Sequence, residues 1–108
     1  MRKMNTKEIS FVSYLISLNP EKKYLINNIS EMNVEDSPDG GMGSLIFSSD
    51  KKDRKLGSDL SSFEFNDLDG VKVIVNLVLD NYGDLYELDI WKTDFSSLIS
   101  LPDISTNF

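Results

Sequence analysis

The chain has 108 residues, 40% of them apolar, and a net charge of −7, which together indicate one folded domain spanning residues 1–108. It contains neither cysteine nor histidine, so disulfides, thiolate metal sites, Ser-His-Asp and Cys-His hydrolases and nearly all zinc sites are excluded. Carboxylate, lysine, tyrosine or serine chemistry remains, which disfavours an enzyme without excluding one.

The first residues, MRKMNTKE, are basic but are not followed by the apolar stretch of a secretory signal. No apolar run anywhere approaches the roughly 20 residues that a membrane-spanning helix needs. We therefore expect a cytoplasmic protein without membrane contact.

Residues 5–27 are expected to be helical. Asn5 is a predicted N-cap, and Glu8 completes a capping box three residues later. Apolar residues then recur at spacings of three and four up to residue 18, as on one face of a helix. The Asn19-Pro20 dipeptide ends this helix, because the residue before proline avoids helical geometry, and a second short helix is expected to follow through residue 26.

Residues 29–93 change to a period of two, which indicates strands. The segment VKVIVNLVLD at 71–80 is apolar on both faces and should therefore lie inside the sheet. A tail at 94–108 should contain a turn or short helix at 94–101 and a frayed end, DISTNF. The fold class is thus α+β, an antiparallel β-meander of about five strands packed against one or two N-terminal helices. The expected strands are 31–35, 44–49, 60–66, 71–80 and 85–92, with a charged loop at 50–57.

The segment DGGMGS at 39–44 admits two interpretations. Its backbone N–H groups could bind an anion, but it precedes a strand and lacks the Lys-Ser/Thr pair of a phosphate-binding loop. A hairpin turn that requires glycine is the better explanation. The residues assigned to structural turns are Gly40, Gly41, Gly43, Gly70 and Gly83.

Acidic residues are concentrated in the second half of the chain. Residues 59–108 carry ten Asp or Glu against two Lys, whereas residues 1–58 are close to neutral. Such a half repels nucleic acids and attracts a basic protein partner, although acidity also serves solubility alone. The predicted partner-binding residues are Asp67, Asp69, Asp84, Glu87, Asp89 and Trp91.

Three of these residues lie on one predicted strand face: Glu87, Asp89 and Trp91. A carboxylate pair two residues apart, about 7 Å, suits a hard cation or two-carboxylate chemistry, and an aromatic beside carboxylates suits a binding hot spot. The competing interpretation buries Trp91 against Phe95 or a helix. An EF-hand is excluded because Phe65 and Asn76 occupy two of its ligand positions, and we predict no metal and no cofactor.

The segments DGGMGSLIF (39–47) and DLDGVKVIVNLVLDNYGDLYELDIWKTDFSSL (67–98) resemble a family of small uncharacterised bacterial domains. The resemblance implies either fold maintenance, with a buried tryptophan and a Lys92–Asp94 or Lys92–Glu87 pair, or a shared site. In size and acidity the chain is similar to immunity proteins of bacterial toxin systems. The positions that carry the resemblance are Gly41, Met42, Gly43, Ser44, Asp67, Asp69, Gly70, Glu87, Asp89, Trp91, Lys92, Asp94 and Phe95.

The functional hypothesis is therefore a cytoplasmic acidic binding protein, an immunity-type inhibitor of a basic toxin. The alternatives are a small enzyme domain that depends on carboxylates or a divalent metal, and a structural subunit that self-associates. The oligomeric state does not follow from the sequence.

Overall fold

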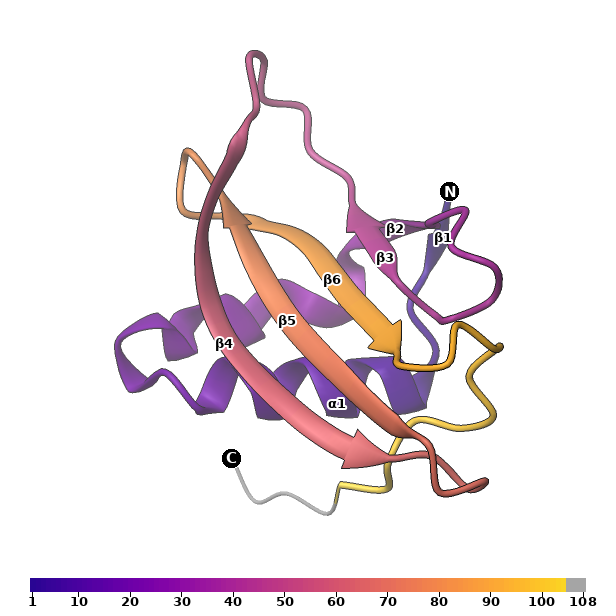
Figure 1. Cartoon of the computed structure of the whole chain (residues 1–108). Coiled ribbons are helices and arrows are strands. Elements are labelled where there is room, and N and C mark those ends of the chain that lie inside the picture. The colour runs from indigo at the N-terminus through magenta and orange to yellow at the C-terminus, as the bar shows by residue number, and fades with distance from the viewer. Residues whose placement is uncertain (105–108) are drawn as a thin grey trace.

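A computed structural model describes residues 1–104, which form a six-stranded antiparallel sheet with helices on one face (Figure 1). The α+β fold class is confirmed. The last four residues of the predicted frayed end lie outside the described residues. The elements are β1 (Arg2–Lys3), α1 (Thr6–Ser17), η1 (Pro20–Glu31), β2 (Asn33–Asp36), β3 (Leu45–Phe47), β4 (Leu56–Asn66), β5 (Lys72–Asp80) and β6 (Leu85–Lys92).

The first helix begins as its sequence predicts. The Asn5 side chain accepts a hydrogen bond from the Glu8 N–H at 2.8 Å, and the Glu8 carboxylate accepts one from the Asn5 N–H at 2.9 Å. The second helical segment, η1, is a 3-10 helix and runs to Glu31, five residues beyond its predicted end. Within residues 1–104, neither α1 nor η1 is long and apolar enough to cross a membrane.

The strand order is β1-β2-β3-β6-β5-β4, with every neighbouring pair antiparallel. The last three strands form a meander, and β5 lies between β4 and β6, as its two apolar faces require. The strand β1 was not expected, and β4 begins at Leu56 inside the predicted loop. The strands expected at 31–35 and 44–49 are shorter or shifted, at 33–36 and 45–47. Because β1 has only two residues, it has no periodicity of its own to reveal it.

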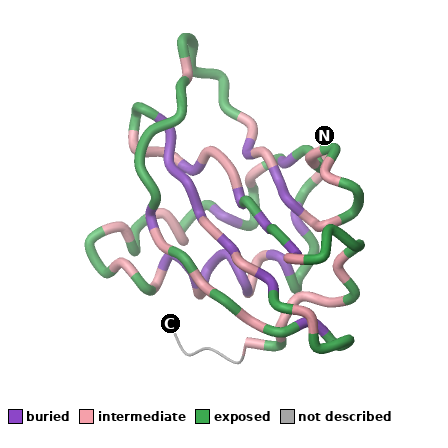
Figure 2. The backbone as a smooth tube through the Cα atoms, in the orientation of Figure 1, coloured by how far each residue is buried: buried purple, intermediate pink, exposed green. Residues whose placement is uncertain are grey.

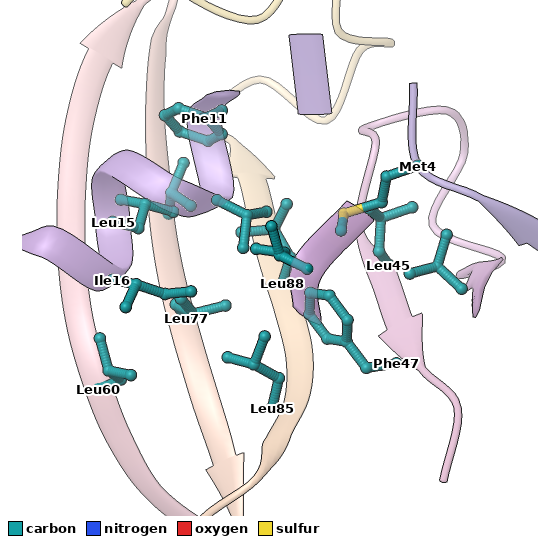
Figure 3. Close-up of a cluster of buried hydrophobic side chains, with 14 of the residues drawn as sticks. Met4, Phe11, Leu15, Ile16, Leu45, Phe47, Leu60, Leu77, Leu85 and Leu88 are labelled. Atoms are coloured by element: carbon teal, nitrogen blue, oxygen red, sulfur yellow. The ribbon is translucent and has the colours of Figure 1, made fainter. Parts of the chain in front are cut away.

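The hydrophobic core lies between α1 and the sheet. Phe11, Leu15 and Ile16 of α1 point at the side chains of β5 and β6, among them Leu77 and Leu88 (Figure 3). Buried positions alternate with exposed or half-buried ones along most of these strands, although residues 77–80 at the end of β5 are all buried (Figure 2). One sheet face is therefore apolar and covered by helices, whereas the other is uncovered (Figure 1).

The segment after β6 is not helical, so of the turn or short helix expected over 94–101 only a turn at its start is present. A tight turn at residues 93–94 is followed by irregular chain, whose side chains Leu98, Leu101 and Ile104 pack against the core. The Leu98 N–H donates to the Gly41 carbonyl at 3.0 Å, so the glycine loop holds this segment in place. A Cβ on Gly41 would lie 2.9 Å from the Ser97 hydroxyl, and its φ of +84° also favours glycine.

Candidate binding face

Lys92 of β6 is buried in an ion-pair cluster at one end of the sheet. Its side chain is 1% exposed, and its ammonium lies 2.9 Å from Asp67 and 2.7 Å from Asp69. It also donates to the Ser97 carbonyl at 3.1 Å. The expected partners of Lys92, Asp94 or Glu87, are therefore wrong. The actual partners lie in the β4–β5 turn, which the folded sheet brings close to the end of β6.

Asp67 is the centre of this cluster. Its carboxylate accepts hydrogen bonds from the backbone N–H groups of Ile99, at 2.7 Å, and Ser100, at 3.1 Å. Burial opposes the ionisation of Asp67, but the donors from Ile99, Lys92 and the turn outweigh it and lower its pKa to about 2. The same arrangement raises the pKa of Lys92: burial opposes its charge, and the hydrogen bonds to the two aspartates overcome that opposition.

A second cluster occupies the opposite end of β5. The Arg54 guanidinium lies 3.0 Å from the buried Asp80 carboxylate and donates to the Phe47 carbonyl at 2.6 Å. The neighbouring Asp84 is half-buried and pairs with Lys51 at 2.6 Å. Both carboxylates thus hold the loop at 50–55 against the sheet.

Three predicted partner-binding residues therefore form ion pairs within the chain itself. Asp67 is fully buried, Asp69 is held by Lys92, and Asp84 is paired with Lys51 at the other end of the sheet. They do not form one surface with the remaining three.

Glu87, Asp89 and Trp91 do share a face, the one that the helices leave uncovered. Residues directly opposite in antiparallel strands lie on the same face, so the strand register extends this face in three rows. One row is Glu64, Ile74 and Trp91, the next is Ser62, Asn76 and Asp89, and the third is Asp59, Val78, Glu87, Ile46 and Glu35. We call these eleven residues the outer face.

The carboxylates of the outer face are largely uncompensated. Glu64 pairs with Lys72 at 3.6 Å, and both side chains are more than half exposed. The other four carboxylates form no ion pair within residues 1–104. Glu87 is half-buried, and the other three are exposed: Glu35, Asp59 and Asp89.

The outer face ends at an exposed aromatic pair, its own residue Trp91 and the nearby Phe95. Trp91 is 43% exposed, so the interpretation that buries it in the core is wrong, although it does contact Phe95 with ring centroids 6.0 Å apart. Phe95 is 70% exposed and adopts φ +64°, a left-handed conformation that side chains rarely adopt. A large aromatic held in water at a strained position is typical of a binding contact rather than of a folding contact.

Sequence reasoning missed several outer-face residues: Glu35, Ile46, Asp59, Glu64 and Ile74. Their alternation was visible in the sequence, but the register that places them beside Glu87 and Trp91 depends on a β-bulge in β4 and on the non-sequential pairing of β3 with β6. The predicted turn glycines all have positive φ: Gly40, Gly41, Gly43, Gly70 and Gly83.

No group of three or more acidic side chains in residues 1–104 is arranged to hold a metal ion. The carboxylates of the outer face are spread over the three strands β2, β4 and β6, whereas Asp67 and Asp69 share the single ammonium of Lys92. The arrangement therefore suits recognition of a cationic surface better than coordination of a single ion.

The sequence model of one family, described as Domain of unknown function (DUF6984), matches residues 1–102. The chain belongs to this family. The expectation of an uncharacterised domain family is confirmed. No curated protein and no solved structure matches the chain. This DUF6984 domain includes both ion-pair clusters and the whole outer face.

Proposed function

We propose that this domain is a binding protein whose outer face recognises a basic protein. The observation that carries the proposal is the set of four carboxylates on the uncovered sheet face that form no ion pair within residues 1–104, beside the exposed pair Trp91 and Phe95. The outer face contains no Lys or Arg, and Lys72 at its border is matched by Glu64.

Charge and aromatic surface have different roles in such binding. Unpaired carboxylates raise the association rate with a cationic partner through long-range attraction and suppress acidic competitors. An aromatic pair provides apolar contact area with few rotatable bonds and can accept a lysine or arginine over its rings, worth about 0.5–2 kcal/mol. Asp89 and Trp91 are two residues apart on β6, so one basic side chain can contact both.

The partner class that the size and acidity of the chain imply is a basic protein toxin, which an immunity-type inhibitor neutralises by covering its cationic surface. The rigid position of the outer face supports this role. Its strands are held by the core on one side and by the two ion-pair clusters at their ends, so little conformational entropy is lost on binding.

The test compares two double charge reversals. Glu87→Lys with Asp89→Lys changes the outer face, whereas Glu21→Lys with Glu31→Lys changes exposed residues of η1. Each single substitution to lysine changes the charge by +2, so the net charge of either double variant is −3 instead of −7. The immobilised chains are offered a cell extract and the product of the neighbouring gene, and captured basic proteins are quantified by mass spectrometry.

We expect capture to fall by about tenfold or more for the outer-face variant and to change little for the η1 variant. Equal capture by both variants would refute the proposal. A third variant, Phe95→Gly, removes the ring at a position where glycine suits the backbone, so it should weaken capture without destabilising the fold.

A further inference from the structure

The strand β4 forms one edge of the sheet and is the longest strand in it, with 11 residues (Figure 1). It pairs with β5 on one side, and on the other side it pairs with no strand of residues 1–104. The opposite edge is β1, which has two residues. Only β4 therefore offers a long free edge within the described part of the chain.

The backbone hydrogen bonds at the end of β4 show which of its groups point outward. The Asp67 N–H donates to the Val71 carbonyl at 2.9 Å, so Asp67 points toward β5. Because the N–H and C=O of one residue point to the same side of a strand and alternate along it, Ser61, Phe63 and Phe65 also point toward β5. The backbone groups of Ser62, Glu64 and Asn66 then point to the free edge, where no partner for them lies within residues 1–104.

The usual devices that protect an edge strand are few here. Leu56–Asn66 contains no proline, lysine or arginine, and its register irregularities are confined to the part before Ser61. From Ser61 to Asn66 the pairing with β5 is regular. Six residues thus present an undistorted edge.

The side chains at this edge are sorted by face. Toward the helices, the half-buried rings of Phe63 and Phe65 contact Phe11 and Tyr14, with centroids 5.5–6.1 Å apart. On the outer face, the Glu64 side chain is 61% exposed. A strand laid beside β4 would therefore meet aromatic rings on one face and a carboxylate on the other.

We propose that the edge Ser61–Asn66 accepts an extended basic segment of a partner protein as a seventh strand, with apolar residues over Phe63 and Phe65 and basic residues beside Glu64. The positive charge of the segment rests on the proposed function, whereas the mode of binding rests on the backbone groups of β4. A second copy of the chain is the less suitable occupant, since it would bring the Asp59 and Glu64 carboxylates of both copies to one edge.

The experiment uses a blocked, fluorescent peptide of ten alternating lysine and valine residues as the probe, with a lysine–proline peptide as its control. Ser62→Pro removes one outward N–H and leaves the bonds to β5 intact, and Ser62→Ala is the matched variant that keeps this N–H. We expect the fluorescence anisotropy of the lysine–valine peptide to rise when the chain is added and that of the lysine–proline peptide to stay unchanged. Ser62→Pro should weaken it by about tenfold or more and Ser62→Ala by less than about twofold.

Amide hydrogen exchange on the unaltered chain gives a second readout that does not depend on the folding of Ser62→Pro. Bound peptide should slow the exchange of the Ser62, Glu64 and Asn66 amides, and unchanged exchange there would overturn the inference. Protection of the same amides without peptide, together with a dimer in sedimentation, would also overturn it, because the occupant would be a second copy.

The two proposals fail separately. If Ser62→Pro binds the peptide and the captured partner normally while the Glu87 and Asp89 reversals abolish capture, the strand-addition mode is wrong and the outer face stands. If Ser62→Pro loses binding while the reversals have no effect, the edge of β4 stands and the proposed function of the outer face is wrong.

Discussion

Lys92 is a buried cation whose surroundings depend on two segments distant in sequence. Its ammonium contacts Asp67 and Asp69, and Asp67 in turn receives the backbone N–H groups of Ile99 and Ser100. Removal of one member of a buried ion pair leaves the other charge without compensation, which is among the most destabilising changes in proteins. Lys92 is thus a residue that fixes the C-terminal segment to the sheet.

We expect Lys92→Met to lower the midpoint of thermal unfolding by roughly 10 °C or more. The matched control is Lys72→Met, whose ion pair with Glu64 is exposed and should change the midpoint by only about 2 °C. Circular dichroism during heating measures both. If the two variants unfold at the same temperature, the cluster does not stabilise the fold.

The helix α1 illustrates how an element can be stabilised by contacts that its own sequence encodes. Asn5 and Glu8 exchange hydrogen bonds at its first turn, and Arg2 binds both Glu8 oxygens, at 2.7 and 2.8 Å. Asn5→Ala should lower the free energy of unfolding by about 1 kcal/mol, because one backbone N–H loses its acceptor. Asn5→Ser keeps an acceptor and should stay within about 0.5 kcal/mol in urea titrations. Equal losses would show that the cap is not the source of the stability.

Elements with a local signal were predicted correctly, whereas contacts between distant segments were not. The Asn5 cap and the alternation in β5 each reside in a few consecutive residues, so the sequence revealed them. The pairing of Lys92 with the β4–β5 turn depends on how the sheet closes, and nearest-neighbour reasoning chose Asp94 and Glu87 instead. Trp91 had two competing interpretations for the same reason, because alternation placed it on a face without revealing that the helices cover the opposite one.

At the scale of the whole molecule, the boundary between the neutral and the acidic half of the sequence nearly coincides with a boundary between structural elements. The helical layer and β1 derive from the nearly neutral first half of the chain, whereas β4, β5 and β6 belong to the acidic half. The core holds the two layers together, and four carboxylates of the acidic half lie on the uncovered sheet face: Asp59, Glu64, Glu87 and Asp89. This division leaves stability to the buried side and places carboxylates that form no ion pair within residues 1–104 on the side available to a partner.

The free energy of unfolding should depend on pH only in acid and in strong base, because the pKa values that differ between the folded and the unfolded chain lie there. Burial opposes the ionisation of Glu8, but the hydrogen bonds from Arg2 outweigh it and lower the pKa of Glu8 from 4.5. Hydrogen bonds from Arg2 also lower the pKa of Asp36, and the pKa of Asp67 is about 2. A lowered carboxyl pKa means that the unfolded chain binds more protons, so this stability is present above about pH 4.5 and is lost as the pH falls toward 2. The pKa of Lys92 is raised from 10.5, so its contribution is present below pH 10.5 and is lost above it.

The measurement is the free energy of unfolding in urea at a series of pH values. Because the chain has no histidine or cysteine, we expect a plateau between roughly pH 5.5 and 9, with a decline on each side. The control is Asp67→Asn, which removes the carboxyl whose pKa is about 2 and should make the acid decline shallower and complete at a higher pH. A transition inside the plateau, or an acid decline identical in Asp67→Asn, would contradict the assignment of acid sensitivity to the buried cluster.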